Sequence, residues 1–279
     1  MNKIHEDINY CKRYLKEHGH SYYFSSWFFP RDLRQATYAL YAFVRVPDEY
    51  VDNQDNSLQK LKRYKKAWIK AYTEQGSKDP VLNATAHIFH TYKIPFTYSL
   101  DFLNAMAMDI HKRTYKNFAE LKRYMYGSAA VVGLMMATII GFKDKAALRY
   151  AEDLGYAMQL TNFLRDIGED HALRKRIYLP QDELLKFNVS TEHFTHKILD
   201  TNFKELMKFN ISRARRYYRS ALKGVPYLAP QGQKAVTIAL VLYRAILNKI
   251  EENEYDVFDQ RAHTGLFEKV ALTIGALYG

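Results

Sequence analysis

The sequence has little of what builds disulfide-linked, collagen-like or loop-dominated proteins. Among its 279 residues are a single cysteine, Cys11, with 7 prolines and 12 glycines. One cysteine excludes an internal disulfide bond and favours a reducing compartment. The scarcity of glycine and proline argues against a collagen-like chain and against a sandwich of strands joined by tight turns. An alternating strand pattern of useful length, an internal repeat and a low-complexity tract are also missing.

Positive charge and aromatic rings are what the chain has in excess. It carries 41 Lys and Arg against 30 Asp and Glu, a net charge of +11, with 23 Tyr and 16 Phe. Basic chains bind nucleic acids, anionic membrane surfaces or polyanionic small molecules, and composition does not separate these partners. The run 212–219 mixes arginine with tyrosine as nucleic-acid stripes do. We interpret it as a solvated helix face with Tyr217 or Tyr218 turned inward, and expect no nucleic acid partner.

Targeting signals are not recognisable. Charged residues, among them Glu6 and Lys12, interrupt the first apolar residues, so no signal peptide is expected and the protein is predicted to be cytoplasmic. Residues 124–142 carry no charge and could just span a bilayer by length. Their glycines favour a buried central helix instead. Peripheral association with a membrane stays open, because anionic headgroups attract Lys and Arg.

Apolar residues recur at helical spacing along nearly the whole chain, which predicts one all-α domain over residues 1–279. Breaker residues such as Pro30, Pro95 and Pro230 fall between the periodic segments. Helices are predicted near 3–17, 22–29, 31–53, 57–74, 80–92, 96–112, 117–140, 144–171, 180–187, 202–223, 231–254 and 264–277.

The helix predicted over 31–53 ends in two carboxylates. Asp48 and Asp52 are four residues apart, so they project from one face, with Arg45 and Tyr41 on the preceding turns of that face. Pro47 should kink or loosen the helix here. Alone, this pattern is also typical of an exposed helix end with a loose ion pair.

The helix predicted over 144–171 carries a polar stripe in an apolar segment. Asn162, Asp166 and Asp170 are spaced four apart, with Gln159 one turn earlier and Arg165 at the edge of the stripe. Buried amides and carboxylates need partners. A hydrogen-bond network with a neighbouring helix would satisfy the stripe.

A second explanation arises if the two helices face each other. Carboxylates opposed across a cavity cannot all stay ionised without a cation. Ligands that are all oxygen select a hard ion such as Mg²⁺, which completes its shell with water and phosphate oxygens. Arg45 and Arg165 could then hold the remaining phosphate charge. The motifs therefore predict a Mg²⁺–diphosphate site, and the apolar helix faces below it predict a tunnel for a hydrocarbon tail.

From His18 to about His263 the chain resembles the squalene and phytoene synthase family, the head-to-head prenyltransferases. The resemblance is carried by 48–52 and, most specifically, by 159–170 followed by 176–180. The tyrosine-rich segment 124–133 resembles the family's central motif, and 255–261 resembles a stretch associated with phytoene synthases. Lys175 stands where many members have glycine.

The resemblance implies an isoprenoid-synthase-type helical bundle around a central hydrophobic tunnel, with two or three Mg²⁺ ions. By resemblance, the metal ligands and acidic catalytic residues are Asp48, Asp52, Asn162, Asp166 and Asp170. Tyr126 is expected beside the reacting carbons, and aromatic walls are expected from Tyr22, Tyr41, Phe43 and Tyr126. The residues expected to bind prenyl diphosphate substrates are His18, Ser21, Tyr22, Tyr41, Arg45, Gln159, Arg165, Arg176, Tyr178, Tyr243 and Arg261.

The activity implied is condensation of two geranylgeranyl diphosphates to phytoene through a cyclopropyl diphosphate. A C30 synthase using farnesyl diphosphate and a catalytically silent scaffold are the alternatives. The small Ser25 and Ser26 lie in an aromatic segment, and we expect Ser26 at the tunnel floor, where it would leave room for a longer chain. The glycine pattern of dinucleotide sites is missing, so no NADPH is expected. The oligomeric state stays open.

Overall fold

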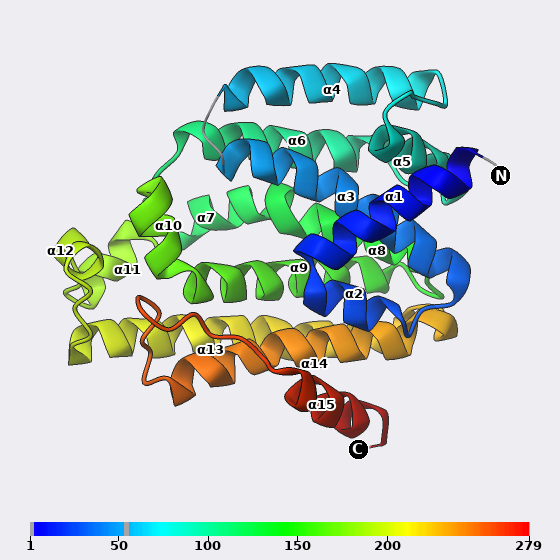
Figure 1. The fold of residues 1–279 in the computed structure, drawn as a ribbon. Helices are drawn as coiled ribbons and strands as arrows, with labels where there is room; N and C mark the ends of the chain where they lie inside the picture. Colours follow the sequence, from blue (N-terminus) through cyan, green and yellow to red (C-terminus); the bar gives the residue numbers. More distant parts are fainter. Residues whose placement is uncertain (1–2, 53–55, 279) are drawn as a thin grey trace.

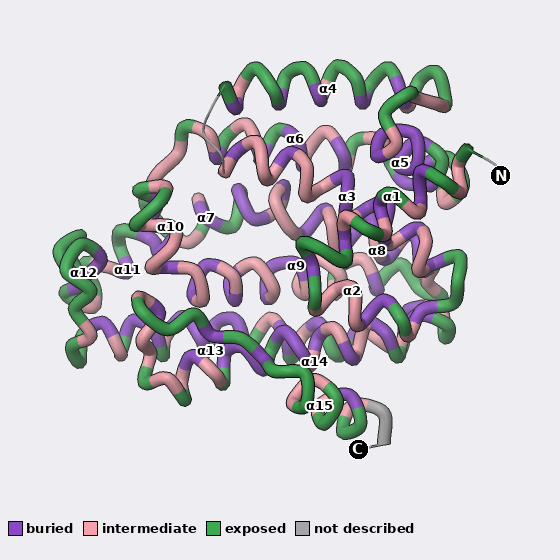
Figure 2. The backbone as a smooth tube through the Cα atoms, in the orientation of Figure 1, coloured by how far each residue is buried: buried purple, intermediate pink, exposed green. Residues whose placement is uncertain are grey.

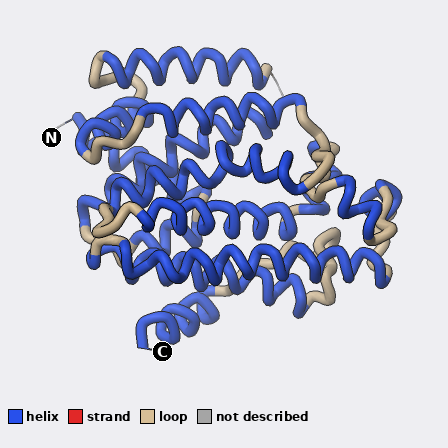
Figure 3. The backbone as a smooth tube through the Cα atoms, turned by 180° about the vertical axis from the view of Figure 1, so that it is seen from behind, coloured by secondary structure: helices blue, strands red, loops and turns tan. Residues whose placement is uncertain are grey.

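A computed structural model describes residues 3–52 and 56–278. Within them the fold is helical, and the only strand-like feature there is an isolated bridge between Phe142 and Leu228 (Figure 3). The elements, in chain order, are α1 (Lys3–His18), α2 (His20–Ser26), α3 (Arg31–Asp52), α4 (Ser57–Thr73), α5 (Pro80–Thr91), α6 (Phe96–His111), α7 (Phe118–Met125), the π-helical turn η1 (Tyr126–Ala130), α8 (Val131–Ile140), α9 (Ala146–Arg165), α10 (Ile167–Arg174), α11 (Gln181–Lys186), α12 (Thr191–Thr195), α13 (Thr201–Gly224), the 3-10 turn η2 (Val225–Tyr227), α14 (Pro230–Glu252) and α15 (Leu266–Tyr278).

The helices are stacked in layers on either side of α9 (Figure 1). The α7–η1–α8 segment packs on one side of α9, with α3 and α6 beyond it and α4 outermost, whereas α13 and α14 pack on the other side. The short helices α10 to α12 lie at one end of the bundle, and α15 lies outside α14. Buried residues form two apolar clusters, and Tyr22 and Tyr126 contact both.

Local sequence signals explain where several helices begin. The Asp79 side chain accepts two backbone N–H hydrogen bonds at the start of α5, and Pro80 occupies the first helical position, where no N–H is needed. The Asn117 and Asp200 side chains cap α7 and α13, and each accepts one backbone N–H hydrogen bond. The helix α3 continues through Pro47 to Asp52, and residue 53 of its predicted range lies outside the described residues.

Two predicted helices are divided in the structure. The range 117–140 contains the π-helical turn η1 between α7 and α8. The range 144–171 breaks at Asp166, whose φ of −101° and ψ of 13° end α9 and let α10 start in a new direction. The short helix α12 was not predicted. The remaining predicted helices are confirmed to within a few residues at their ends.

The apolar segment through residues 124–142 lies at the centre of the bundle, as predicted. Phe118–Ile140 is the one stretch of the described chain that is long and apolar enough to cross a membrane, yet it packs between α6 and α9. Glycines allow the close packing: a Cβ on Gly155 would lie 2.6 Å from the Ala129 carbonyl oxygen, and one on Gly133 would collide with the Ala151 carbonyl oxygen. The α8 and α9 backbones are therefore in direct contact.

The basic run 212–219 lies on α13 and is only partly solvated. Tyr218 is buried and its hydroxyl contacts that of Thr161, which confirms the prediction that one of the two tyrosines of the run is turned inward. Arg213 is also buried, because it pairs with Glu183 through two hydrogen bonds. Part of the run therefore stabilises the fold.

Candidate active site

A cavity of about 1010 Å³ runs through the bundle beside α9. The α9 side chains that line it recur every three or four residues from Ala147 to Asn162, so one face of the helix forms the wall. From Ala147 to Asp166 this wall is roughly 28 Å long at 1.5 Å per residue. The predicted tunnel is thus present.

The two ends of the cavity differ in chemistry. The end near α10 is lined by charged side chains from four segments: Asp48, Asp52, Asp109, Arg165, Asp166, Glu169, Asp170, Arg174, Arg176 and Arg261. The opposite end is lined by apolar side chains, among them Phe29, Ile140, Ala147, Leu228, Ala235 and Val236. An elongated molecule with an anionic head and an apolar tail matches this polarity.

The last turns of α3 supply the first pair of carboxylates. Asp48 accepts a hydrogen bond from Arg45 at 2.5 Å, and Arg45 also pairs with Glu49 at 3.2 Å. The Asp48 carboxylate is enclosed by protein but open to the cavity. Burial, and then the neighbouring Asp52 carboxylate, raise the pKa of Asp48 to about 6 despite the arginine. A cation between Asp48 and Asp52 would relieve this repulsion.

The second acidic group lies at the junction of α9 and α10. Burial would raise the pKa of Asp166, but its ion pairs with Arg165 (2.5 Å) and Arg261 (2.9 Å) outweigh burial and hold the pKa below its usual range. Burial and the Asp166 charge raise the pKa of Asp170 to about 7. The buried Oδ1 atom of Asn162 has no hydrogen-bond partner.

Two arginines connect the two acidic groups. Arg174 contacts Asp52 at 2.8 Å and Asp170 at 3.1 Å, so one guanidinium bridges α3 and α10. Arg176 lies 3.1 Å from Asp109 and 3.7 Å from Asp52. No sequence pattern singles out Arg174 or Asp109, because each stands alone in its segment and only the fold brings it to the cavity.

The donor set fits a hard divalent cation. Carboxylates face one another across the cavity, three of them (Asp48, Asp109 and Asp170) have raised pKa values, and the Asn162 side-chain oxygen Oδ1 lacks a hydrogen-bond partner. In the described part of the chain, no three acidic, His or Cys side chains are already gathered at one point in metal-binding geometry. Arg174 lies between the carboxylates, so its guanidinium would have to turn away when a cation is held there.

The turn between α1 and α2 closes one side of the acidic end. His18, His20 and Ser21 line the cavity there. His18 lies 3.4 Å from Glu49 on α3, and a Cβ on Gly19 would lie 2.7 Å from the Tyr41 ring. Glycine at position 19 therefore leaves room for the Tyr41 side chain of α3 beside this turn.

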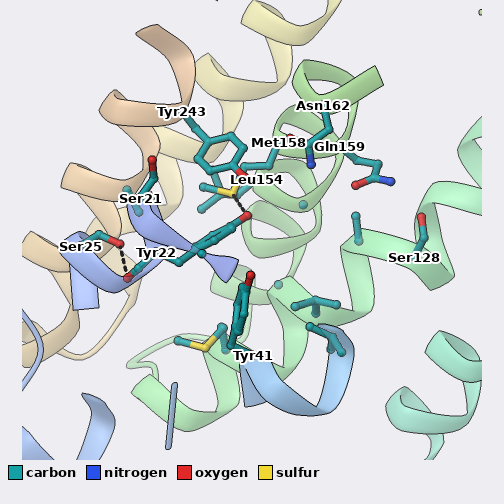
Figure 4. Close-up of a pocket in the computed structure, with 18 of the residues that line it drawn as sticks. Ser21, Tyr22, Ser25, Tyr41, Ser128, Leu154, Met158, Gln159, Asn162 and Tyr243 are labelled. Carbon is teal, nitrogen blue, oxygen red and sulfur yellow. Dashed lines mark hydrogen bonds between the residues drawn. The ribbon is translucent and has the colours of Figure 1, made fainter. Parts of the chain in front are cut away.

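Three tyrosines from different helices meet in the middle of the cavity (Figure 4). The Tyr22 ring lies 5.9 Å from that of Tyr41 and 5.2 Å from that of Tyr243. The Tyr22 hydroxyl donates to the Met158 sulfur at 3.7 Å, and Leu154 lies beside it. The cluster contributes aromatic rings from α2, α3 and α14 to the cavity lining.

Three sequence-based placements are wrong. Tyr126 does not line the cavity; Tyr124, two positions earlier and therefore on another helix face, does. Phe43 is fully buried in the core against Trp68. Ser26 is buried behind the wall, with its hydroxyl donating to the Tyr23 carbonyl at 2.7 Å, and Ser25 lines the cavity instead.

Tyr124 lies in a stack of rings at the acidic end. Its ring is 6.0 Å from that of Tyr178, which stacks on Phe163 at 4.0 Å. The Tyr178 hydroxyl donates to Asp109 at 3.0 Å. Burial and the Asp109 charge raise the pKa of Tyr124, so its hydroxyl stays protonated at neutral pH. Of the residues predicted to be catalytic, to bind metal or to bind substrate, all except Tyr126 line the cavity.

Comparisons with known proteins agree with this arrangement. The profile of the squalene/phytoene synthase family matches residues 15–268. A phytoene synthase of Arthrospira platensis is 34% identical over 93% of this chain and 89% of its own, and a 15-cis-phytoene synthase of Synechococcus elongatus is 31% identical over 97% and 92%. The crystal structure of a dehydrosqualene synthase with a ligand superposes with a TM-score of 0.93 at 28% identity, over 98% of this chain and 96% of that one.

Proposed function

Because the chain belongs to the squalene/phytoene synthase family, we propose that it condenses two geranylgeranyl diphosphates head to head to phytoene, a step of carotenoid biosynthesis. Phytoene synthases that are 31–36% identical over nearly the whole chain support this choice. The observation that carries it is a cavity that has a carboxylate- and arginine-lined end and a long apolar end. We take residues 1–279 as one catalytic domain.

Binding of the diphosphates is assigned to the acidic end. Asp48 and Asp52 would hold Mg²⁺ from α3, and Asn162, Asp166 and Asp170 from α9 and α10, with two or three ions in total. Bound Mg²⁺ supplies Lewis acidity to the departing diphosphate. Arg45, Arg165 and Arg261 are placed to hold its remaining charge with fixed donors, and His18 and Ser21 close over one diphosphate.

The chemical step is assigned to the region around the tyrosine cluster. Loss of diphosphate from one chain leaves an allylic cation at C1, and the C2=C3 double bond of the second chain attacks it. Loss of a proton closes the cyclopropane ring, and a second diphosphate loss, rearrangement and proton loss give the triene-centred hydrocarbon. The ring faces of Tyr22, Tyr41 and Phe163 stabilise positive charge, and the apolar wall excludes water that would give an alcohol. We expect no NADPH requirement, since none of these reaction steps is a reduction.

Product analysis tests the proposal. The purified protein is incubated with Mg²⁺ and either geranylgeranyl or farnesyl diphosphate, and the organic extract is examined by mass spectrometry. We expect a C40 hydrocarbon that is lost with EDTA and in Asp48→Asn. A C30 product from farnesyl diphosphate alone would support the second candidate, which the close superposition on a dehydrosqualene synthase favours. No product from either substrate would support a scaffold role.

Localisation follows from the same proposal. The substrates and the product are lipids and the chain is basic, so we propose a cytoplasmic protein that associates peripherally with a membrane.

A further inference from the structure

The outer face of α15 is apolar although it faces solvent. The side chains of Leu266, Phe267, Val270 and Ile274, called here the outer stripe, are 66%, 92%, 44% and 55% exposed. The intervals between successive members of the stripe are one, three and four residues, so the four side chains share one face of the helix. Figure 2 shows α15 outside α14 and mostly exposed.

The charged residues of the same helix are turned the other way. Glu268 pairs with Lys249 of α14 at 3.5 Å, and Lys269 lines the cavity, where burial lowers its pKa. A surface helix of a soluble protein normally presents charges to water and apolar residues to the core. In α15 this arrangement is reversed, and contiguous exposed apolar side chains mark an interaction surface.

We infer that the outer stripe docks α15 into the interfacial layer of an anionic lipid bilayer. The inward side of this segment, through Thr264 and Lys269, is part of the cavity wall, so the helix separates the substrate cavity from the proposed bilayer. The stripe carries no carboxylate, and the net charge of +11 complements anionic headgroups.

A bilayer fits this surface better than another protein does because the molecules proposed to bind in the cavity are lipids. This step rests on the proposed function: prenyl substrates and a C40 hydrocarbon partition into lipid, and a cavity wall that lies on the bilayer shortens their path through water. The 13 described residues of α15 are fewer than the roughly 20 that cross a bilayer, and we place this stretch in the membrane surface. The surface assigned to the membrane is therefore the outer stripe, with α15 parallel to the bilayer.

Vesicle flotation without substrate tests the inference. The full chain is floated with vesicles of phosphatidylglycerol and phosphatidylcholine, and we expect it to bind. The variant carrying Phe267→Glu and Ile274→Glu should bind about tenfold or more weakly, because buried apolar area is lost and charge is placed in the interface. The control Leu185→Glu, at a 77% exposed position on α11 at the far end of the bundle, should bind like the original chain.

Several outcomes would overturn the inference. These are no flotation of the original chain, equal binding by the double variant, or loss of binding in the Leu185→Glu control. A dimer in light scattering that the double variant dissociates, with no vesicle binding by either protein, would assign the outer stripe to a second copy. Equal circular dichroism and thermal midpoints confirm that the variants fold. Vesicle binding is measured without substrate, so its result does not depend on the result of the product analysis.

Discussion

At the scale of single residues, arginines pair with the carboxylates at the acidic end of the cavity but do not remove the repulsion between those carboxylates. Asp48 and Asp170 keep pKa values of about 6 and about 7 although each has an arginine partner. Because these pKa values lie above those of unfolded Asp, the stability that the two groups contribute is present at low pH. It is lost as the pH rises through 6 and 7.

Replacing Asp170 by asparagine should remove the repulsion between its carboxylate and those of Asp166 and Asp52. At pH 8, Asp170→Asn removes a buried charge that faces Asp166 and Asp52, so the metal-free protein should melt higher. We expect roughly 2–4 °C, the shift that about 1 kcal/mol produces in a domain of this size. At pH 5 Asp170 is protonated in the folded protein but still ionised in the unfolded chain, so the gain should be clearly smaller than at pH 8. Thermal unfolding at both pH values measures it, and an equal gain at pH 5 would contradict the assignment.

Arg174 should compete with divalent cations for the carboxylates. Its guanidinium contacts Asp52 and Asp170, which we assign to the metal. In Arg174→Gln the metal-free protein should melt lower, and Mg²⁺ should raise its midpoint by more than it raises that of the original chain. Arg215→Gln, which removes an ion pair with Glu251 on another surface, is the matched control. An unchanged Mg²⁺ increment in Arg174→Gln would show that Arg174 does not occupy the cation position.

At the scale of helices, the sequence predicted which segments are helical but not where two of them break. The break at Asp166 follows a regular helical pattern, and its cause is tertiary: Gly168 donates its N–H to the Val257 carbonyl, and a Cβ there would lie 2.7 Å from that oxygen. The π-helical turn η1 adds a residue to one turn, which changes the face that later side chains present. The motif held both Tyr124 and Tyr126, and only the packing of α7 shows which faces the cavity.

The contact between η1 and α9 should be sensitive to a single methyl group. In Gly155→Ala the new Cβ would meet the backbone of Ala129 and Ala130, which cannot move without separating the helices. We expect a loss of about 1–3 kcal/mol in unfolding free energy. The control is Gly275→Ala on α15, where a Cβ meets nothing within 4 Å and the helix gains about 0.5–1 kcal/mol. Denaturant unfolding of both variants checks this, and equal stability changes would show that the close contact is absent.

At the scale of the whole molecule, residue spacing predicted the helices that carry the carboxylates, and the family resemblance supplied the arrangement in which they meet at a cavity with an apolar extension. The identity of the wall residues was not predictable, because it depends on helix rotation. Ser25 and Ser26 are neighbours in the same aromatic segment, but only Ser25 reaches the cavity. Contacts between segments that are distant in the sequence bring Arg174 and Asp109 to the site, and such contacts leave no recognisable sequence pattern.

Cavity length should set the length of the substrate. Ser25 lies between Ser21 at the acidic end and Phe29 at the apolar end, so Ser25→Phe would narrow the passage. We expect turnover of geranylgeranyl diphosphate to fall at least about tenfold. Turnover of farnesyl diphosphate serves as the internal control and should be retained or improved. Steady-state kinetics with both substrates measure the ratio, and an unchanged preference would remove Ser25 from the wall that limits chain length.

The location of the reaction is tested most directly by a crystal structure with Mn²⁺ and a non-hydrolysable prenyl thiodiphosphate, using anomalous scattering to find the metal. We predict Mn²⁺ peaks between Asp48 and Asp52 on α3 and Asn162, Asp166 and Asp170 on α9 and α10. We also predict that the tail runs along α9 toward Ala147. Metal peaks outside these two acidic groups, or a tail that avoids the cavity, would contradict it.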